Sequence, residues 1–296
     1  MLRSMTAFAA AKGAQHGFSW TWEMRSVNGK GLDLRLRVPD WVEGLEPGLR
    51  ARIGRALGRG NVSLNLKLAR DDGAGALAVN AAQLEDVLTA MAEVENRAMA
   101  RGVTLAPATA ADLLGLRGVL DTGAADEDTE ALRTTLLADF EGLLTAFLDM
   151  RATEGRALAD VLTAQLDEIE RLTADAAQAA EARKPDMEQA FRTALARVMD
   201  TADTADEARV AQELALLAVK ADVTEEIDRL RAHIAAARDL LASGSPVGRK
   251  LDFLSQEFNR EANTLCSKAQ NKALTATGLE LKTVIDQMRE QVQNVE

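Results

Sequence analysis

Cysteine and long apolar runs are scarce in this sequence, and both scarcities exclude classes of protein. The 296 residues include one cysteine, Cys266, so no disulfide can form within the chain, and a lone thiol is typical of a reducing compartment. No stretch approaches the roughly 18 consecutive apolar residues of a membrane-spanning helix, and the first residues lack the long apolar segment of a signal peptide. We therefore expect a cytoplasmic protein without membrane contacts, in which Cys266 is a small packing residue.

Positive charge is also in deficit, but the deficit is confined to one part of the chain. The net charge of −11 argues against a nucleic-acid partner, because phosphates repel an acidic protein. Residues 1–70 nevertheless hold 12 Lys and Arg against 5 Asp and Glu, whereas residues 71–246 hold 16 against 34, and residues 247–296 hold 7 of each. A basic surface for an anionic partner is therefore compatible with the acidic whole.

Apolar residues alternate with polar ones in three stretches near the start, 18–24, 32–38 and 62–68. A period of two predicts strands of a sheet with one buried face. Between the second and third stretches, Leu45, Leu49 and Ile53 recur every four residues and predict a short helix. The pair Asn28-Gly29 predicts a hairpin turn between the first two strands.

The outward face of these strands is rich in cations. It carries Arg25, Arg35, Arg37 and Lys67, and nine of the twelve cations in residues 1–70 are arginines. The planar guanidinium group suits bidentate contact with phosphate, so this face is a candidate RNA-binding surface. The alternative is that these side chains only solubilise the open face of the sheet.

Beyond residue 80, apolar spacing is helical throughout. We expect helices at about 80–100, 108–116, 127–183, 186–200, 206–243, 248–270 and 273–295. The predicted class is α+β, with a small N-terminal antiparallel sheet and a helix, followed by a mostly α-helical C-terminal part with a long helical arm or bundle. Three parts follow from this reading: a basic α+β N-terminal domain (1–125), an acidic helical arm (126–246) and a C-terminal helical segment that carries the candidate site (247–296).

The long predicted helix 127–183 exceeds ordinary helix lengths, so it either protrudes as a hairpin or is broken. Gly155, near its middle, costs a helix about 1 kcal/mol relative to alanine.

The segment 248–268, "GRKLDFLSQEFNREANTLCSK", holds more charge than a packing helix needs. A helical projection puts Glu257, Glu261 and Lys268 together along one edge of its apolar stripe. The two carboxylates repel each other, so we expect compensation by a divalent metal ion, an arginine or Lys268. Arg249 and Lys250 lie at the helix start, where the helix dipole disfavours cations, and this position suits an external anion.

A second acidic cluster lies at 220–233 and includes Asp222, Glu225, Glu226 and His233. Neither cluster has the spacing of a zinc site, and oxygen ligands with one imidazole suit Mg²⁺ or Mn²⁺. The alternative is that both clusters form ordinary ion pairs with neighbouring helices.

Six segments together resemble the YicC/YloC family of bacterial proteins. They are "RSMTAF" at 3–8, "EMRSVNGKGLDLRLRVP" at 23–39, "MRATEG" at 150–155, "ADVTEEIDRLRAH" at 221–233, the segment 248–268 and "IDQMREQVQNVE" at 285–296. The resemblance implies a divalent-metal-dependent endoribonuclease of RNA turnover that assembles as a ring-like hexamer. Two departures stand out: many relatives have His-Arg where this chain has Gly29-Lys30, and many have Asp in place of Asn271.

The working hypothesis is hydrolysis of phosphodiester bonds in single-stranded or structured RNA. Glu257, Glu261 and Asp252 are the predicted ligands of Mg²⁺ or Mn²⁺, and Glu226 and His233 are predicted to join the two glutamates in catalysis. The predicted RNA-binding residues are Arg25, Asn28, Lys30, Arg35, Arg249, Lys250, Arg260, Asn263 and Lys268.

Two other interpretations stay open at this point. The protein could be a non-catalytic RNA-binding adaptor whose helical arm docks a nuclease or other RNA-decay proteins, or a purely structural helical protein. The C-terminal spacing of Leu281, Ile285, Met288, Val292 and Val295 fits oligomerisation or partner binding, although its short length favours packing within the chain.

Overall fold

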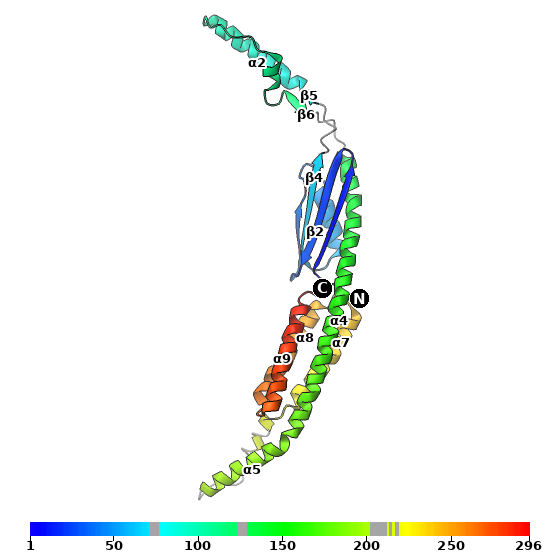
Figure 1. The fold of residues 1–296 in the computed structure, drawn as a ribbon, viewed down its shortest axis with the longest axis vertical. Helices are drawn as coiled ribbons and strands as arrows, with labels where there is room; N and C mark the ends of the chain where they lie inside the picture. Colours follow the sequence, from blue (N-terminus) through cyan, green and yellow to red (C-terminus); the bar gives the residue numbers. More distant parts are fainter. Residues whose placement is uncertain (71–76, 123–128, 202–211, 213–214, 217–218) are drawn as a thin grey trace.

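The computed structural model describes residues 1–296 except 71–76, 123–128, 202–211, 213–214 and 217–218. The molecule is elongated and curved, with a four-stranded sheet near its middle and helices above and below (Figure 1). Residues 1 and 296 lie close together, between the sheet and the C-terminal helices. None of the described helices has an apolar stretch long enough to cross a bilayer.

The sheet consists of β1 (Ala7–Gln15), β2 (Phe18–Val27), β3 (Leu32–Arg37) and β4 (Gly60–Arg70), in the order β1-β2-β4-β3. The three predicted strands are confirmed, and β1 is additional; its sequence, AFAAAKGAQ, has too little contrast between alternate residues to predict a strand. His16 and Gly17 join β1 to β2 with φ of 57° and 73°, the left-handed geometry of a tight two-residue hairpin.

The predicted hairpin at Asn28-Gly29 is wrong, because β4 lies between β2 and β3. Helix α1 (Leu45–Ala56) connects β3 to β4, and this crossover makes the two strands parallel. The sheet is therefore mixed, with antiparallel pairs β1–β2 and β2–β4. Residues 28–31 instead pass the start of β4, where the amide of Gly60 donates to the carbonyl of Gly31 at 2.9 Å.

The sheet packs its apolar face against α1 and the first half of α4 (Thr129–Ala182). Trp20 and Trp22 lie on this face, and both indole Nε1–H groups donate to one carboxylate oxygen of Asp139 on α4, at 2.7 and 3.0 Å. Phe140 and Phe147 of α4 are fully buried in the same core. These contacts attach the long helix to the sheet.

The second half of α4 belongs to a second core, which it forms with α7 (Thr224–Ser243), α8 (Gly248–Lys268) and α9 (Lys272–Val292). In this bundle α4 contacts α7 and α9, and α8 contacts both of these helices. The α+β prediction is confirmed. The prediction that the helix 127–183 protrudes as a hairpin or is broken is wrong, because α4 is one continuous helix that packs against both cores. The C-terminal apolar series from Leu281 to Val295 is buried within the chain, as its short length predicted.

The ends of the molecule carry the remaining described elements. One end holds β5 (Leu77–Val79), α2 (Ala81–Ala100), α3 (Ala110–Leu114) and β6 (Leu120–Thr122), and the other holds α5 (Lys184–Thr201) (Figure 1). The predicted helix 206–243 is described only in its later part, and much of its start lies outside the described residues. The helix α7 begins at Thr224, whose amide and hydroxyl both donate to the carboxylate of Asp222, at 3.0 and 2.7 Å.

The two cores meet where both ends of the described chain cross α4. Ser4 and Val295 form an antiparallel bridge, and the amide of Glu296 donates to the carbonyl of Arg3 at 3.0 Å. The guanidinium of Arg151 is completely buried there; its Nε donates to the carbonyl of Ser4 at 2.5 Å, and Nη2 lies 3.5 Å from a carboxylate oxygen of Glu296. Burial lowers the pKa of Arg151, and the negative charge of Glu296 opposes that shift.

The glycine at position 155 is explained by this junction. A Cβ atom at position 155 would lie 2.2 Å from the carbonyl oxygen of Leu2, so only glycine lets the first residues cross α4 this closely. Gly142, on the same helix, offers a matched comparison: among the described residues, no atom outside its adjacent residues and the nearby helix backbone lies within 4 Å of the place that a Cβ would take.

Replacing Gly155 with alanine is expected to destabilise the protein by about 2 kcal/mol, because backbone must move to admit the methyl group. Gly142→Ala is expected to stabilise it by up to about 1 kcal/mol, the ordinary gain of alanine over glycine in a helix. Urea unfolding followed by circular dichroism measures both. Equal shifts in the two variants would contradict the close crossing.

Candidate functional site

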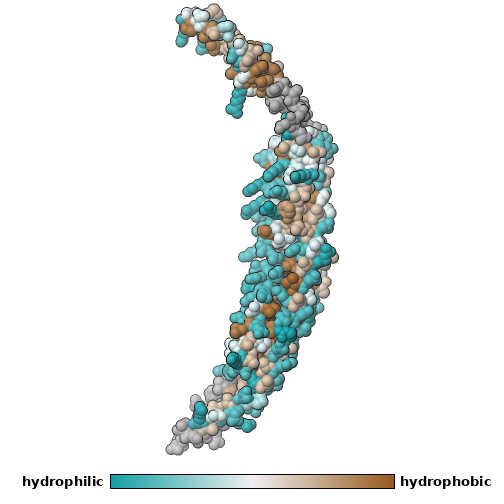
Figure 2. Space-filling model, viewed as in Figure 1, coloured by the Kyte–Doolittle hydropathy of each residue, from teal (hydrophilic) through white to brown (hydrophobic). Residues whose placement is uncertain are grey.

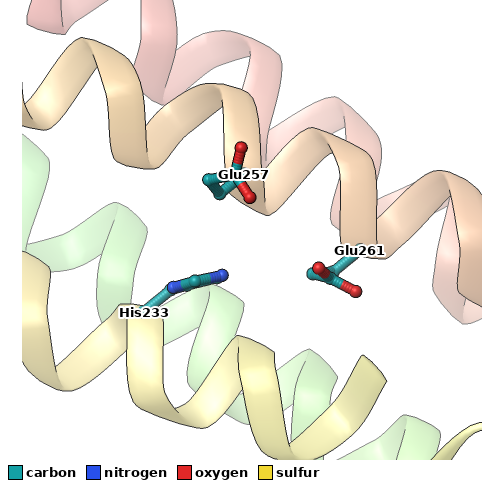
Figure 3. Close-up of side chains that lie close together, drawn as sticks. All are labelled: His233, Glu257 and Glu261. Atoms are coloured by element: carbon teal, nitrogen blue, oxygen red, sulfur yellow. The ribbon is translucent and has the colours of Figure 1, made fainter. Parts of the chain in front are cut away.

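Three side chains that could bind a metal ion meet between α7 and α8 (Figure 3). His233 comes from α7, and Glu257 and Glu261 come from successive turns of α8. One imidazole nitrogen and one oxygen from each carboxylate all lie within 4.8 Å of one another. Glu257 and Glu261 were predicted as metal ligands, and His233, which was predicted as a catalytic residue, lies next to them.

The two carboxylates of this group have different surroundings. Glu261 is 3% exposed, and Nη1 of Arg229 on α7 donates to its carboxylate at 3.3 Å. This hydrogen bond, together with the charge of Glu225, raises the pKa of Arg229. Glu257 is more exposed and has the guanidinium of Arg260 3.8 Å away. An arginine therefore offsets part of the negative charge of each glutamate.

The imidazole of His233 has a buried Nε2 atom with no hydrogen-bond partner among the described residues. The edge of its ring packs against Phe258, with the ring centres 5.7 Å apart. A buried nitrogen without a partner costs about 1–3 kcal/mol, so a ligand at this atom removes a penalty. One imidazole nitrogen with two carboxylate oxygens is a donor set that fits Mn²⁺ and, with water completing the shell, Mg²⁺.

The structure places Glu226 and Asp252 outside this group. Glu226 is 5% exposed, and Nζ of Lys268 donates to it at 2.8 Å. The sequence left open whether a metal ion, an arginine or Lys268 balances the charge of the glutamates. In the structure Arg229 pairs with Glu261, whereas Lys268 pairs with Glu226. Asp252 instead accepts a hydrogen bond from Gln256 at 3.1 Å and lines a separate cavity.

That cavity lies at the junction of the two cores and measures about 560 Å³. Its lining brings together three cations from distant parts of the chain: Lys30 after β2, Arg59 before β4 and Arg249 at the start of α8. In the described part of the chain none of the three forms an ion pair with a carboxylate. Backbone carbonyls hold the arginines instead: Arg59 donates to Gly29 at 3.3 Å, and Arg249 donates to Lys30 at 2.9 Å.

The cavity therefore has an excess of positive charge, offset only by Asp252 among its lining residues. Asn28, Lys30 and Arg249 were predicted RNA-binding residues, and they meet here. Sequence reasoning missed Arg59 and Asn61, which also line the cavity. Arg59 follows Arg50, Arg52 and Arg55 at short intervals, and no sequence pattern distinguishes it from them. In the structure Arg50 and Arg52 pair with glutamates, whereas Arg59 lines the cavity.

The other predicted RNA-binding residues do not converge on this cavity. Arg25 and Arg35 are exposed on the open face of the sheet, where they flank Ser63 from both sides. Arg260 and Asn263 lie on the exposed side of α8, and Lys250 lines a groove next to α7. Hydrophilic side chains gather on one side of the middle of the molecule, over the sheet and the helices α8 and α9 (Figure 2).

Two further residues have structural explanations. Burial raises the pKa of the Cys266 thiol, which is the opposite of what a nucleophile needs, and its Sγ packs against Gly278. Asn271 caps α9: its side-chain oxygen accepts from the amides of Ala273 and Leu274 at 2.8 and 3.2 Å. Asparagine and aspartate cap helices equally well, so the departure at position 271 preserves the cap.

Comparison with known proteins finds related sequences over both halves of the chain. The family model described as "Endoribonuclease YicC-like, N-terminal region" matches residues 2–160, and the model described as "Endoribonuclease YicC-like, C-terminal" matches residues 176–296. The chain belongs to the YicC-like endoribonuclease family. The two YicC-like regions meet within α4, the helix that both cores share.

Two relatives in the YicC-like family match over the full length of both chains. A protein of Haemophilus influenzae named "Probable endoribonuclease YicC" is 37% identical over 298 residues. A protein of Clostridioides difficile with the same name is 28% identical over 310 residues. The resemblance drawn from the sequence segments is thus confirmed.

Removing the partner of Glu226 is expected to be costly. Lys268→Met leaves a buried carboxylate unpaired and is expected to destabilise the protein by about 2 kcal/mol, less than a fully buried pair because Lys268 is partly exposed. The double variant Glu226→Gln/Lys268→Met is expected to recover much of this loss. Urea unfolding measures the cycle, with Lys272→Met at an exposed position of α9 as the control. Equal stability of Lys268→Met and the control would contradict the pairing.

Proposed function

We propose that this protein is a divalent-metal-dependent endoribonuclease that hydrolyses phosphodiester bonds in single-stranded or structured RNA and takes part in RNA turnover. The observation that carries the proposal is His233, whose buried Nε2 has no partner among the described residues and whose imidazole lies beside the carboxylates of Glu257 and Glu261. The names of the two relatives support the same class of activity.

In this proposal Nε2 of His233 and the carboxylates of Glu257 and Glu261 hold one Mg²⁺ or Mn²⁺ ion. When bound, such an ion lowers the pKa of a water molecule and shields the charge of the phosphate. Hydrolysis forms a bond from the water oxygen to phosphorus and breaks the bond to the leaving sugar oxygen, which receives a proton. Arg229 and Arg260, which contact the two glutamates, place positive charge beside the bound phosphate.

Glu226 acts as a positioning residue in this scheme. Its ion pair with Lys268 joins α7 to α8 two helical turns from His233. Because the imidazole and the two glutamates come from different helices, this pair helps to fix the distance between them. Replacing Glu226 is therefore expected to weaken metal binding without removing a ligand.

The cavity at the junction supplies RNA binding. Lys30, Arg59 and Arg249 present positive charge that no lining carboxylate but Asp252 offsets, at a fixed place that suits a phosphate group of the RNA backbone. The open face of the sheet adds Arg25 and Arg35. The resemblance to the family further implies a homo-oligomer, with a hexameric ring as the expected form and other RNA-decay proteins as expected partners; mass photometry tests the oligomer.

Cleavage of an end-labelled structured RNA tests the activity. With Mn²⁺ or Mg²⁺ we expect internal cuts that disappear in EDTA and fall at least about 100-fold in the Glu257→Gln/Glu261→Gln variant. Glu290→Gln, which removes an exposed carboxylate from α9, is expected to cut like the wild type. Calorimetric titration with Mn²⁺ should show binding to the wild type and to Glu290→Gln only.

Equal cutting by the wild type and the double variant would contradict the proposed centre. Binding of RNA without cleavage in any metal would instead favour the adaptor function, which the basic cavity and the arginines of the sheet also support. Product analysis separates mechanisms, because attack by water leaves no 2′,3′-cyclic phosphate.

Removing the two cavity arginines is expected to weaken RNA binding. Arg59→Gln/Arg249→Gln should lower the affinity for a single-stranded RNA about tenfold or more and reduce the slope of log affinity against log salt by about 0.7 for each lost phosphate contact. Fluorescence anisotropy at several salt concentrations measures both quantities. Arg55→Gln, an exposed arginine of α1 outside the cavity, is the control. An unchanged slope would show that the cavity does not hold a phosphate.

A further inference from the structure

Phe253 is an aromatic side chain on the surface of α8, 60% exposed, whereas Phe258 on the same helix is completely buried. Single exposed apolar residues are ordinary, so exposure alone indicates nothing. The surroundings of Phe253 are more specific. It lines a groove of about 600 Å³ between α7 and α8, together with the cations Arg249 and Lys250 and one carboxylate, Asp239, so the lining keeps a net positive charge.

The groove lies between the same two helices as the proposed metal centre. Arg249, Phe253, Glu257 and Glu261 follow one another at intervals of four residues, so each step rises about 6 Å along α8 and turns about 40° around it. On α7, Ala236 and Leu240 line the groove and lie one and two turns beyond His233. Both walls of the groove thus extend from the residues of the metal centre.

Arg249 lines this groove and the basic cavity at the junction. The cavity, the groove and the metal centre therefore follow one another along α8 in the order cation, aromatic ring, carboxylates. Arg249 and Glu257 are about 12 Å apart along the helix axis, a span of about four nucleotides when the bases are stacked at 3.4 Å and fewer when they are extended.

We infer that this groove is a binding track for unpaired RNA nucleotides, in which a base stacks on the ring of Phe253. The inference rests on the proposed function, because it takes RNA as the substrate. Arg249 and Lys250 contact phosphates on one side of the stacked base, and a phosphate farther along the strand on the other side reaches Glu257, Glu261 and His233. Phe253 is then a positioning residue that sets which phosphodiester bond lies at the metal centre.

The same geometry specifies the class of RNA. Every base has a flat face, so stacking on phenylalanine tolerates all sequences. In a duplex the bases are stacked on each other and paired, so none is free to cover the ring. The groove therefore selects unpaired segments, such as loops and single strands, rather than a particular sequence.

Three variants test this inference without metal, so that nothing is cleaved. The ligand is a single-stranded oligoribonucleotide carrying 2-aminopurine, whose fluorescence falls when it stacks, with EDTA present. Phe253→Ala is expected to bind it about tenfold more weakly and to lose the quenching, while its affinity for a duplex of the same sequence stays unchanged. Phe253→Trp should retain both the affinity for the single strand and the quenching. Leu279→Ala removes an equally exposed apolar side chain from α9 and should behave like the wild type.

With Mn²⁺, Phe253→Ala is expected to raise KM for single-stranded RNA about tenfold, with a smaller effect on kcat and a shifted cleavage site. If Phe253→Ala showed the same quenching and affinity as the wild type, the inference would be overturned, and a protein partner would be left as the occupant of the groove. Loss of quenching in Phe253→Ala, combined with a wild type that never cleaves RNA, would support the track and reject the nuclease. A wild type that binds no RNA would reject both.

Discussion

The continuous helix α4 is the constraint on which the rest of the structure depends. Its first half covers the sheet and its second half packs with α7, α8 and α9, so one rigid element belongs to both cores. Arg151 and Gly155 lie where the two halves meet, and both hold the first residues of the chain against the helix. The loop after β2 and the start of α8 are thereby fixed close together, and the basic cavity between them follows from that packing.

Charge compensation explains how an acidic protein presents a surface for an anionic partner. The nearly buried carboxylates Glu226 and Glu261 are each matched by a cation, Lys268 or Arg229, as burial requires. Arg59 and Arg249 are instead held by backbone carbonyls, which orient a guanidinium without neutralising it. The net charge of −11 therefore gives no measure of the local potential in the cavity.

Helical periodicity predicted part of the candidate site and failed where the site involves a second element. Glu257 and Glu261 are one turn apart, so their common face followed from spacing alone. Asp252 was grouped with them by sequence proximity, yet five residues turn a helix by about 140° beyond a full turn and direct its side chain to a different cavity. His233 was predicted to act with the two glutamates, but that its ring lies next to them depends on α7 packing beside α8, which spacing within one helix does not encode.

The α+β class and the buried face of each predicted strand followed from the sequence alone, because periodicity is a local property that the chain expresses wherever it folds. Only the tertiary structure decided that β4 separates β2 from β3, that Arg249 reaches the carbonyl of Lys30 across 219 positions, and that three side chains from two helices share one point. Such contacts depend on how whole elements pack against one another. No local pattern encodes that packing, so the site emerges only when the two cores are assembled on one helix.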